Sequence, residues 1–140
     1  MNFFRRYWQI AAIAILIIAL DQWTKSLVRA NIPLSGSWLP EGWEWLSPYA
    51  RIVHWYNTGA AFGMFQQGGM VFTVLAFIVI GLILYYYPQV EKADWSLRLA
   101  MSMQLGGAAG NLIDRLTIGH VTDFISLGNF PVFNVADASI

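Results

Sequence analysis

An apolar run without a charged residue, residues 70–87, constrains the fold of this chain more than any other feature. The run is long enough to cross a bilayer core as a helix, and Pro88 ends it. Charged residues make up 11% of the chain, against about 25% in soluble domains. With 57% apolar residues the chain cannot cover a water-facing surface, so we expect lipid to cover much of it. Its 140 residues allow a single membrane-embedded domain, residues 1–140.

Further segments predict membrane helices on either side of this run. Residues 10–20 are apolar and follow a short basic N-terminus, a combination that is also typical of a signal peptide. No small-residue cleavage site follows, because Asp21, Gln22 and Trp23 come next, so we favour an uncleaved helix over about residues 7–28. Residues 97–114 predict a third helix, rich in the small residues that let membrane helices pack closely. Residues 134–140 predict the opening of a fourth helix whose remainder is missing.

The segment between the first two helices, residues 31–69, has a different composition, with prolines, glycines and several tryptophans. Tryptophan favours the membrane–water interface, where its ring is half wet. The stretch 49–56 contains β-formers without glycine or proline and predicts a strand that ends at a turn, Asn57-Thr58-Gly59. The predicted fold is therefore an α-helical membrane protein, an up-down bundle of transmembrane helices with a small interfacial β-sheet. A loop is expected over about residues 115–132.

Charge and cysteine content exclude several function classes. Eight basic and eight acidic residues cancel, and no basic stripe exists to follow a nucleic-acid backbone. The absence of cysteine rules out a disulfide framework and a thiolate nucleophile. The basic residues divide equally between the two predicted sides of the membrane. Orientation is therefore undecided unless Lys25 and Arg115 are discounted as ion-paired, which would place the N-terminus inside.

The polar residues of the predicted helices cluster at one side of the membrane. Asp21 and Lys25 lie four residues apart at the exit of the first helix, so they share a face and can pair. Asn111 and Arg115 repeat this spacing at the exit of the third helix. An up-down arrangement brings these exits and the entrance of the fourth helix to one surface. The remaining members of the cluster are Asp114, Asp123, Asn134 and Asp137.

This cluster contains the residues of an acid–base site and lacks those of the common alternatives. A zinc site is not indicated, because no cysteine is present and His120 has no second histidine at ligand spacing. No serine sits in a nucleophile elbow, and no phosphate-binding glycine loop precedes a lysine. Two close carboxylates share one proton, which allows one to activate water while the other protonates a carbonyl oxygen. Asp123 and Asp137 suit this role best, because neither has an obvious local cation.

Simpler interpretations remain open for the same residues. The Asp21–Lys25 pair is explained by a structural ion pair or a helix-end anchor, and Asn57-Thr58-Gly59 by a turn. Asp114 and Arg115 are explained by a structural or positioning role. Asp123 alone could be an exposed loop residue, and Asp137 alone could cap a helix. His54 could face water or pack in the surface sheet. The glycines of the third helix suggest a packing face rather than a ligand cradle: Gly106, Gly107 and Gly110.

At these positions the sequence resembles the lipoprotein signal peptidase family, also called signal peptidase II. Blocks that resemble the family's motifs occur in the family's order along the chain. They are Asp21-Gln22-Trp23-Thr24-Lys25, Asn57-Thr58-Gly59-Ala60-Ala61-Phe62, Gly106-Gly107-Ala108-Ala109-Gly110-Asn111-Leu112-Ile113-Asp114-Arg115, Val121-Thr122-Asp123-Phe124 and Phe133-Asn134-Val135-Ala136-Asp137.

The resemblance implies a membrane aspartic endopeptidase without a cofactor or metal. It implies a monomeric four-helix protein of the bacterial inner membrane, with both termini cytoplasmic and the site and sheet on the periplasmic side. Asp123 and Asp137 would be catalytic. Substrates would be prolipoproteins whose cysteine carries diacylglycerol, cleaved before that cysteine, and the cyclic peptide globomycin would inhibit. The implied lining residues are Asn57, Asn111, Arg115, Asn134 and Ala136, supported by Asp21, Lys25, Gly59 and Asp114.

Other interpretations come from different classes of protein. A small transport subunit would use the aspartates as an ion path, but such a path places charges at several depths, whereas residues 70–87 carry none. A second alternative is an inactive, lipid-binding relative. Members of the family continue through a full fourth helix and this chain ends at Ile140, so a fragment or a truncated form is expected.

Overall fold

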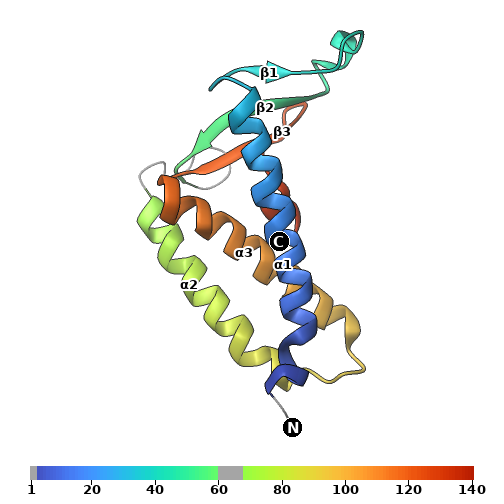
Figure 1. Ribbon diagram of the computed structural model, residues 1–140, viewed down its shortest axis with the longest axis vertical. Coiled ribbons are helices and arrows are strands. Elements are labelled where there is room, and N and C mark those ends of the chain that lie inside the picture. The colour runs from blue at the N-terminus through green and yellow to red at the C-terminus, as the bar shows by residue number, and fades with distance from the viewer. Residues whose placement is uncertain (1–2, 60–67) are drawn as a thin grey trace.

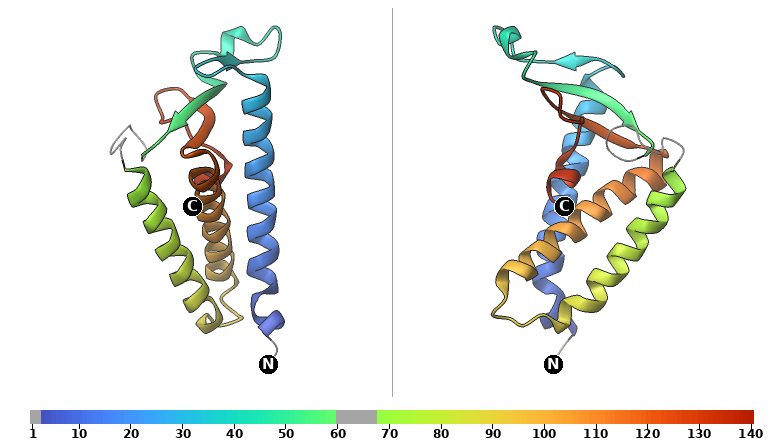
Figure 2. Two further views of the ribbon diagram at one scale, coloured as in Figure 1. Left: turned by 60° about the vertical axis from the view of Figure 1, so that its left-hand side comes forward. Right: turned by 180° about the vertical axis from the view of Figure 1, so that it is seen from behind.

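The computed structural model describes the backbone of residues 3–59 and 68–140. Long helices stand side by side, and a small sheet lies over the end of the bundle opposite the N-terminus (Figure 1; Figure 2). The helices are α1 (Phe3–Asn31), α2 (Gly69–Tyr86), α3 (Trp95–Ile118) and the short α4 (Val135–Ala138). The strands are β1 (Ser37–Trp38), β2 (Ala50–Asn57) and β3 (Val121–Leu127). Short 3-10 turns occupy Glu44–Leu46 and Tyr87–Gln89.

Two of the helical segments are long and apolar enough to cross a membrane by length and composition. They are Tyr7–Asn31, with mean hydropathy 1.5, and Gly69–Gln89, with mean hydropathy 2.4. Neither is a buried core helix, because 22% and 11% of their most apolar windows are buried. Large apolar side chains such as Leu16 and Phe77 are instead exposed on the outer surface. Such a surface is stable when lipid covers it.

Helix α3 packs against both other long helices, and its glycines allow the close approach to α1 (Figure 2). A Cβ atom at Gly106 would lie 2.8 Å from the Cβ of Ile17. At Gly110 it would lie 2.7 Å from Oδ2 of Asp21. The packing-face interpretation of these glycines is therefore correct.

The ends of α3 are set by local sequence. Asp94 caps its start by accepting a hydrogen bond from the Leu97 N–H at 3.2 Å. Gly119 ends it in the left-handed region, with φ 81°. The helix is longer than the sequence suggested, Trp95–Ile118 against about 97–114.

The predicted small sheet is present, with antiparallel strand order β1-β2-β3. Its third strand, Val121–Leu127, lies in the segment that was expected to be a loop over residues 115–132, and that expectation is wrong. β3 pairs along β2, with Trp55 opposite Asp123 and Asn57 opposite Val121. The chain then returns to β3, where Ile125 and Phe133 exchange backbone hydrogen bonds of 2.8 and 3.1 Å. This return brings the start of α4 beside the centre of β3.

Apolar cores hold the two ends of the bundle. Away from the sheet, Ile10, Ile83 and Tyr87 pack together. Beneath the sheet, the end of α1 packs on the sheet through a cluster formed by Val28, Ile32 and Phe124. The strand β3 is thereby fixed to α1, which places its polar residues against the helix bundle.

Candidate active site

Asp123 occupies a buried position in β3 and is 3% exposed. Its two carboxylate oxygens accept hydrogen bonds from side-chain amides, from Asn134 Nδ2 at 2.7 Å and from Asn57 Nδ2 at 2.8 Å. Burial, followed by the nearby negative charge of Asp137, raises the pKa of Asp123 to about 6, although the two amide hydrogen bonds oppose this shift. The interpretation of Asp123 as an exposed loop residue is therefore wrong.

Asp137 lies in the first turn of α4, in a capping box with Asn134. The Asn134 backbone N–H donates to Asp137 Oδ2 at 3.1 Å, and the Asp137 N–H donates to Asn134 Oδ1 at 2.9 Å. The other Asp137 oxygen, Oδ1, accepts a hydrogen bond from Asn111 Nδ2 at 2.7 Å. Asp137 therefore is a cap residue, and the same geometry holds its exposed carboxylate in a fixed place near Asp123.

A hollow of about 500 Å³ opens beside Asp137, and we name it the site hollow. Polar groups line one part of its wall and aromatic groups line another. The polar wall includes Asn57, Asn111, Arg115 and Asp137, and the apolar wall includes Phe72, Val132, Phe130 and Phe133. Gly59 also lines it, and its N–H donates to Asn57 Oδ1 at 3.0 Å, so the expected turn also orients the Asn57 amide.

Arg115 lies on the wall of the site hollow, with its guanidinium carbon 5.7 Å from the ring centre of Phe72. Its Nε is buried and has no hydrogen-bond partner within the described part of the chain. Arg115 was expected to be the local cation of Asp114, but Asp114 instead pairs with Lys25 and Arg29. Adjacent residues of a helix point about 100° apart, so they rarely meet. Arg115 therefore has an N–H donor available for a ligand in the site hollow.

A buried ion cluster lies behind the carboxylates. Lys25 is 0% exposed, and its Nζ lies 2.8 Å from Asp21 Oδ2 and 3.2 Å from Asp114 Oδ2. The third ammonium proton donates to Asn111 Oδ1 at 2.9 Å. The Asp21–Lys25 ion pair expected from the spacing is therefore present, and it extends to the third helix.

The ion cluster fixes which way the Asn111 amide points. Its Oδ1 accepts hydrogen bonds from Lys25 and from Asn134 Nδ2, the latter at 3.1 Å. Because Lys25 is a donor only, the amide oxygen must face it and the NH₂ group must face Asp137. Asn111 thereby connects the buried ammonium to the exposed carboxylate.

The carboxylates of this cluster also anchor the segments that carry Asp123 and Asp137. Asp114 Oδ2 accepts a hydrogen bond from the Thr122 N–H at 3.0 Å, next to Asp123. Asp21 Oδ1 accepts one from the Ala136 N–H at 3.0 Å, next to Asp137. Ala136 is fully buried, so it serves the site through its backbone.

Two residues of this network were not among the predicted site residues. Gln22 Nε2 donates to Asp114 Oδ1 at 3.1 Å and to the Gly110 carbonyl at 3.1 Å. Arg29 NH1 donates to Thr122 Oγ1 at 3.0 Å. Arg29 follows Lys25 by four residues, so the helical spacing could have identified it. Residues Ala60, Ala61 and Phe62 of the second motif block lie outside the described residues.

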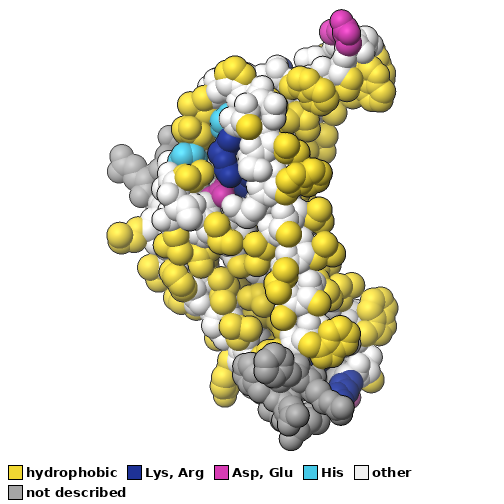
Figure 3. All heavy atoms as spheres, in the orientation of Figure 1, with side chains coloured by type: hydrophobic (Ala, Val, Ile, Leu, Met, Phe, Trp, Pro, Cys, Tyr) yellow, Lys and Arg dark blue, Asp and Glu magenta, His cyan; other side chains and the backbone are white. Residues whose placement is uncertain are grey.

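The histidines lie near this network without forming a metal site. His54 is buried in the sheet, where its Nδ1 lies 2.7 Å from the Ile32 carbonyl oxygen. His120 contacts the Tyr56 ring at 3.7 Å between centroids, and burial lowers its pKa. Among the described residues, no group of three or more histidine or acidic side chains could hold a metal. Figure 3 shows histidine, basic and acidic side chains gathered in a recess near the sheet, above a largely hydrophobic surface.

Comparison with known proteins agrees with this geometry. Residues 13–140 match the family model described as signal peptidase (SPase) II. A lipoprotein signal peptidase of Shouchella clausii is 42% identical over 132 residues, which cover 91% of this chain and 82% of the relative. One of Moorella thermoacetica is 38% identical over 128 residues, with the same coverage of each chain.

Solved structures agree as well. A bacterial membrane enzyme determined in meso at 2.3 Å resolution superposes with a TM-score of 0.83 at 27% identity, covering 94% of this chain and 79% of that one. A second, at 1.9 Å resolution, gives a TM-score of 0.80 at 27% identity and covers 94% and 84%. These findings do not favour a non-enzymatic transport or lipid-binding subunit. The chain belongs to the signal peptidase II family and is a membrane peptidase of the lipoprotein signal peptidase type.

Proposed function

We propose that Asp123 and Asp137 are the catalytic pair of an aspartic endopeptidase. The observation that carries this proposal is that Asp137 lines the site hollow, and that Asp123, bound to the hollow-lining Asn57, lies close enough for the two charges to interact. Side-chain amides hold both carboxylates. Burial, and after it the charge of Asp137, raise the pKa of Asp123, as expected for a buried carboxyl that shares one proton with a neighbour. Because Asp123 is the more buried of the two, we assign the shared proton to Asp123 and the negative charge to Asp137.

The chemistry then follows from the two positions. Asp137 takes a proton from water as the water oxygen adds to the scissile carbonyl carbon, and Asp123 gives its proton to the carbonyl oxygen. When the tetrahedral intermediate collapses, Asp137 passes its proton to the leaving amine. The hydroxyl formed on the intermediate returns its proton to Asp123 as the carbonyl re-forms. Both carboxyl groups end in their starting states.

The proposed substrate is a prolipoprotein whose cysteine carries diacylglycerol, cleaved before that cysteine. The aromatic wall of the site hollow, with Phe72 and Phe130, suits apolar side chains of a signal peptide. Arg115 and Asn57 are placed to hold backbone carbonyl oxygens by donating N–H groups. Acyl chains that stay in the bilayer would hold the scissile bond at the depth of the hollow, which makes the encounter nearly intramolecular. Globomycin is expected to compete for the same hollow.

The proposed setting is the bacterial inner membrane, with the sheet and the site on the periplasmic face and the N-terminus in the cytoplasm. Exposed tryptophans around the sheet support an interfacial position, because their rings favour the headgroup region. They are Trp38, Trp43, Trp45 and Trp55. A monomeric four-helix bundle, with α4 as the start of the fourth helix, completes this proposal.

Cleavage of a diacylglyceryl-modified prolipoprotein in detergent, followed as a gel shift, tests the assignment. Asp123→Asn and Asp137→Asn should each lower the cleavage rate by about 10²- to 10⁴-fold, because each removes an acid–base group. Glu41→Gln serves as the control, since Glu41 is exposed in the loop before β2. Circular dichroism and thermal unfolding of each variant separate lost chemistry from lost fold. Cleavage at the wild-type rate by either folded aspartate variant would contradict the assignment.

A further inference from the structure

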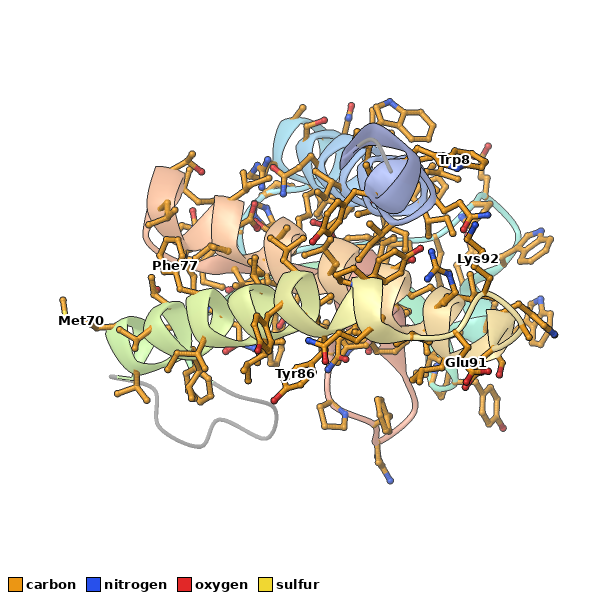
Figure 4. All side chains as sticks on the ribbon, turned by 90° about the horizontal axis from the view of Figure 1, so that it is seen from below. Trp8, Met70, Phe77, Tyr86, Glu91 and Lys92 are labelled. Carbon is orange, nitrogen blue, oxygen red and sulfur yellow. The ribbon has the colours of Figure 1, made fainter. Side chains whose placement is uncertain are left out.

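A second hollow, of about 380 Å³, lies between α1 and the start of α3, at the end of the bundle away from the sheet. Residues from each helix line it at helical spacing. From α1 they are Trp8, Gln9, Ala12 and Ile13, and from α3 they are Trp95, Arg98, Leu99 and Ser102. Tyr87 and Lys92, from the connection between α2 and α3, complete the wall. Figure 4 shows Trp8 and Lys92 on the same side of the molecule.

The basic and acidic residues of the connection between α2 and α3 line two different hollows. Among the described residues, the second hollow is lined by the cations Lys92 and Arg98 and by no acidic residue. The neighbouring acidic residues, Glu91 and Asp94, line a different depression with Tyr86, where the described part of the chain places no cation. In Figure 4, Lys92 lies between Trp8 and Glu91. The second hollow is therefore positive on its own, although the chain as a whole has no net charge.

Polar groups in this hollow have unused hydrogen-bonding capacity. Tyr87 is 0% exposed, and its buried hydroxyl has no partner among the described residues. Arg98 uses one N–H on the Val90 carbonyl at 3.2 Å and another on Gln9 Oε1 at 3.4 Å, which leaves further guanidinium donors free. The Tyr87 ring holds the guanidinium in place, with 4.2 Å between the Arg98 carbon and the ring centroid. Guanidinium donors that are fixed over the Tyr87 ring, in a hollow that Lys92 also lines, favour an anionic ligand.

We propose that this hollow binds the phosphate of an anionic phospholipid. Lys92 and Arg98 would contact the phosphate oxygens, as basic pockets between membrane helices do for lipid headgroups. A lipid is favoured over free phosphate because apolar residues continue the lining along the two helices, where acyl chains could lie. Lys92 and Trp95 lie just before and at the start of α3, and Ala12, Ile13 and Leu99 lie further along α1 and α3. This inference needs a chain that spans a membrane and does not depend on the proposed catalytic residues.

Native mass spectrometry of the purified full chain tests the site. The protein is released from micelles that contain equal amounts of phosphatidylglycerol and phosphatidylcholine, and the retained lipid is counted. We expect at least a threefold preference for phosphatidylglycerol. Lys92→Glu and Arg98→Gln should each abolish that preference. Arg51→Gln is the matched control, because it removes one exposed cation at the sheet end of the molecule and should leave the preference unchanged.

Each alternative outcome overturns the proposal. Equal retention of the two lipids by the wild-type protein would do so, and so would an equal loss of preference in Arg51→Gln. Inorganic phosphate at millimolar concentration is added in a further arm. If it displaces phosphatidylglycerol and binds equally well without lipid, the hollow is a phosphate site and the lipid assignment fails. Because Arg98 also bonds to Val90, thermal unfolding is recorded for its variant, and Lys92→Glu alone decides the outcome if Arg98→Gln unfolds.

Discussion

Replacement of Asp123 by asparagine tests the electrostatics of the site without substrate. Burial and the charge of Asp137 raise the pKa of Asp123 in the folded protein from its ordinary 3.8 to about 6. The folded state therefore binds this proton more tightly than the unfolded state does. The resulting contribution to the free energy of unfolding is fully present below about pH 4 and is lost as pH rises through about 6.

The size of this effect follows from the shift. A difference of about 2 pKa units corresponds to roughly 3 kcal/mol, because one unit is worth about 1.4 kcal/mol. Between pH 4 and pH 7.5 the wild-type protein should lose about 2 to 3 kcal/mol of stability through this residue. Asp123→Asn has no such titration. The substitution also places an NH₂ group against the amide donors of Asn57 and Asn134, but that cost is nearly the same at every pH.

Denaturant unfolding in detergent, followed by circular dichroism at pH 4 and pH 7.5, measures the effect. The stability of Asp123→Asn relative to wild type should rise by about 2 to 3 kcal/mol between the two pH values. Glu41→Gln, an exposed control, should change by less than about 0.5 kcal/mol. A relative stability that stays constant, or falls with pH, would show that folding does not raise the pKa of Asp123 and would refute the reasoning.

Two further substitutions test the support behind the site by thermal unfolding in detergent. Lys25→Met should lower the free energy of unfolding by about 3 to 5 kcal/mol, because it leaves the buried carboxylates of Asp21 and Asp114 without this cation. An unchanged melting temperature would mean that the cluster does not hold the helices together. Gly110→Ala should cost about 1 to 3 kcal/mol, because the new Cβ would lie 2.7 Å from Asp21 Oδ2. Gly81→Ala, with nothing within 4 Å of its Cβ, should cost less than about 0.5 kcal/mol, and equal costs would exclude the packing explanation.

The sequence predicted those parts of the fold whose signal is local. Apolar length identified α1 and α2, and the four-residue spacing of Asp21 and Lys25 identified their ion pair. The strand β3 was missed because Thr122 and Asp123 interrupt its apolar residues. Both polar side chains are buried against α1, α3 and α4, and their partners are remote in sequence. From sequence alone, a polar residue is expected to be exposed unless a partner lies close to it in the chain.

The partner of Asp114 shows a second limit of sequence reasoning. Arg115 is its neighbour in the chain, whereas Lys25 and Arg29 are its partners in space. Helical geometry alone argues against the Asp114–Arg115 pair, since consecutive side chains face different directions. It does not identify the true partners, which depend on how α1 packs against α3. That packing depends on the close approach at Gly106 and Gly110.

The ion cluster explains how Asp123 on β3 and Asp137 on α4 are held in fixed positions relative to each other. Asp123 lies on a strand in a three-stranded sheet, and Asp137 lies in a four-residue helix, so neither element is rigid by itself. Lys25 holds Asp21 and Asp114, and these carboxylates hold the backbone beside each aspartate. The same ammonium fixes the Asn111 amide that contacts Asp137. Buried ion clusters add little net stability compared with apolar packing. Here the cluster instead sets orientation, because a cation that can only donate determines the direction of every hydrogen bond from Lys25 to Asp137.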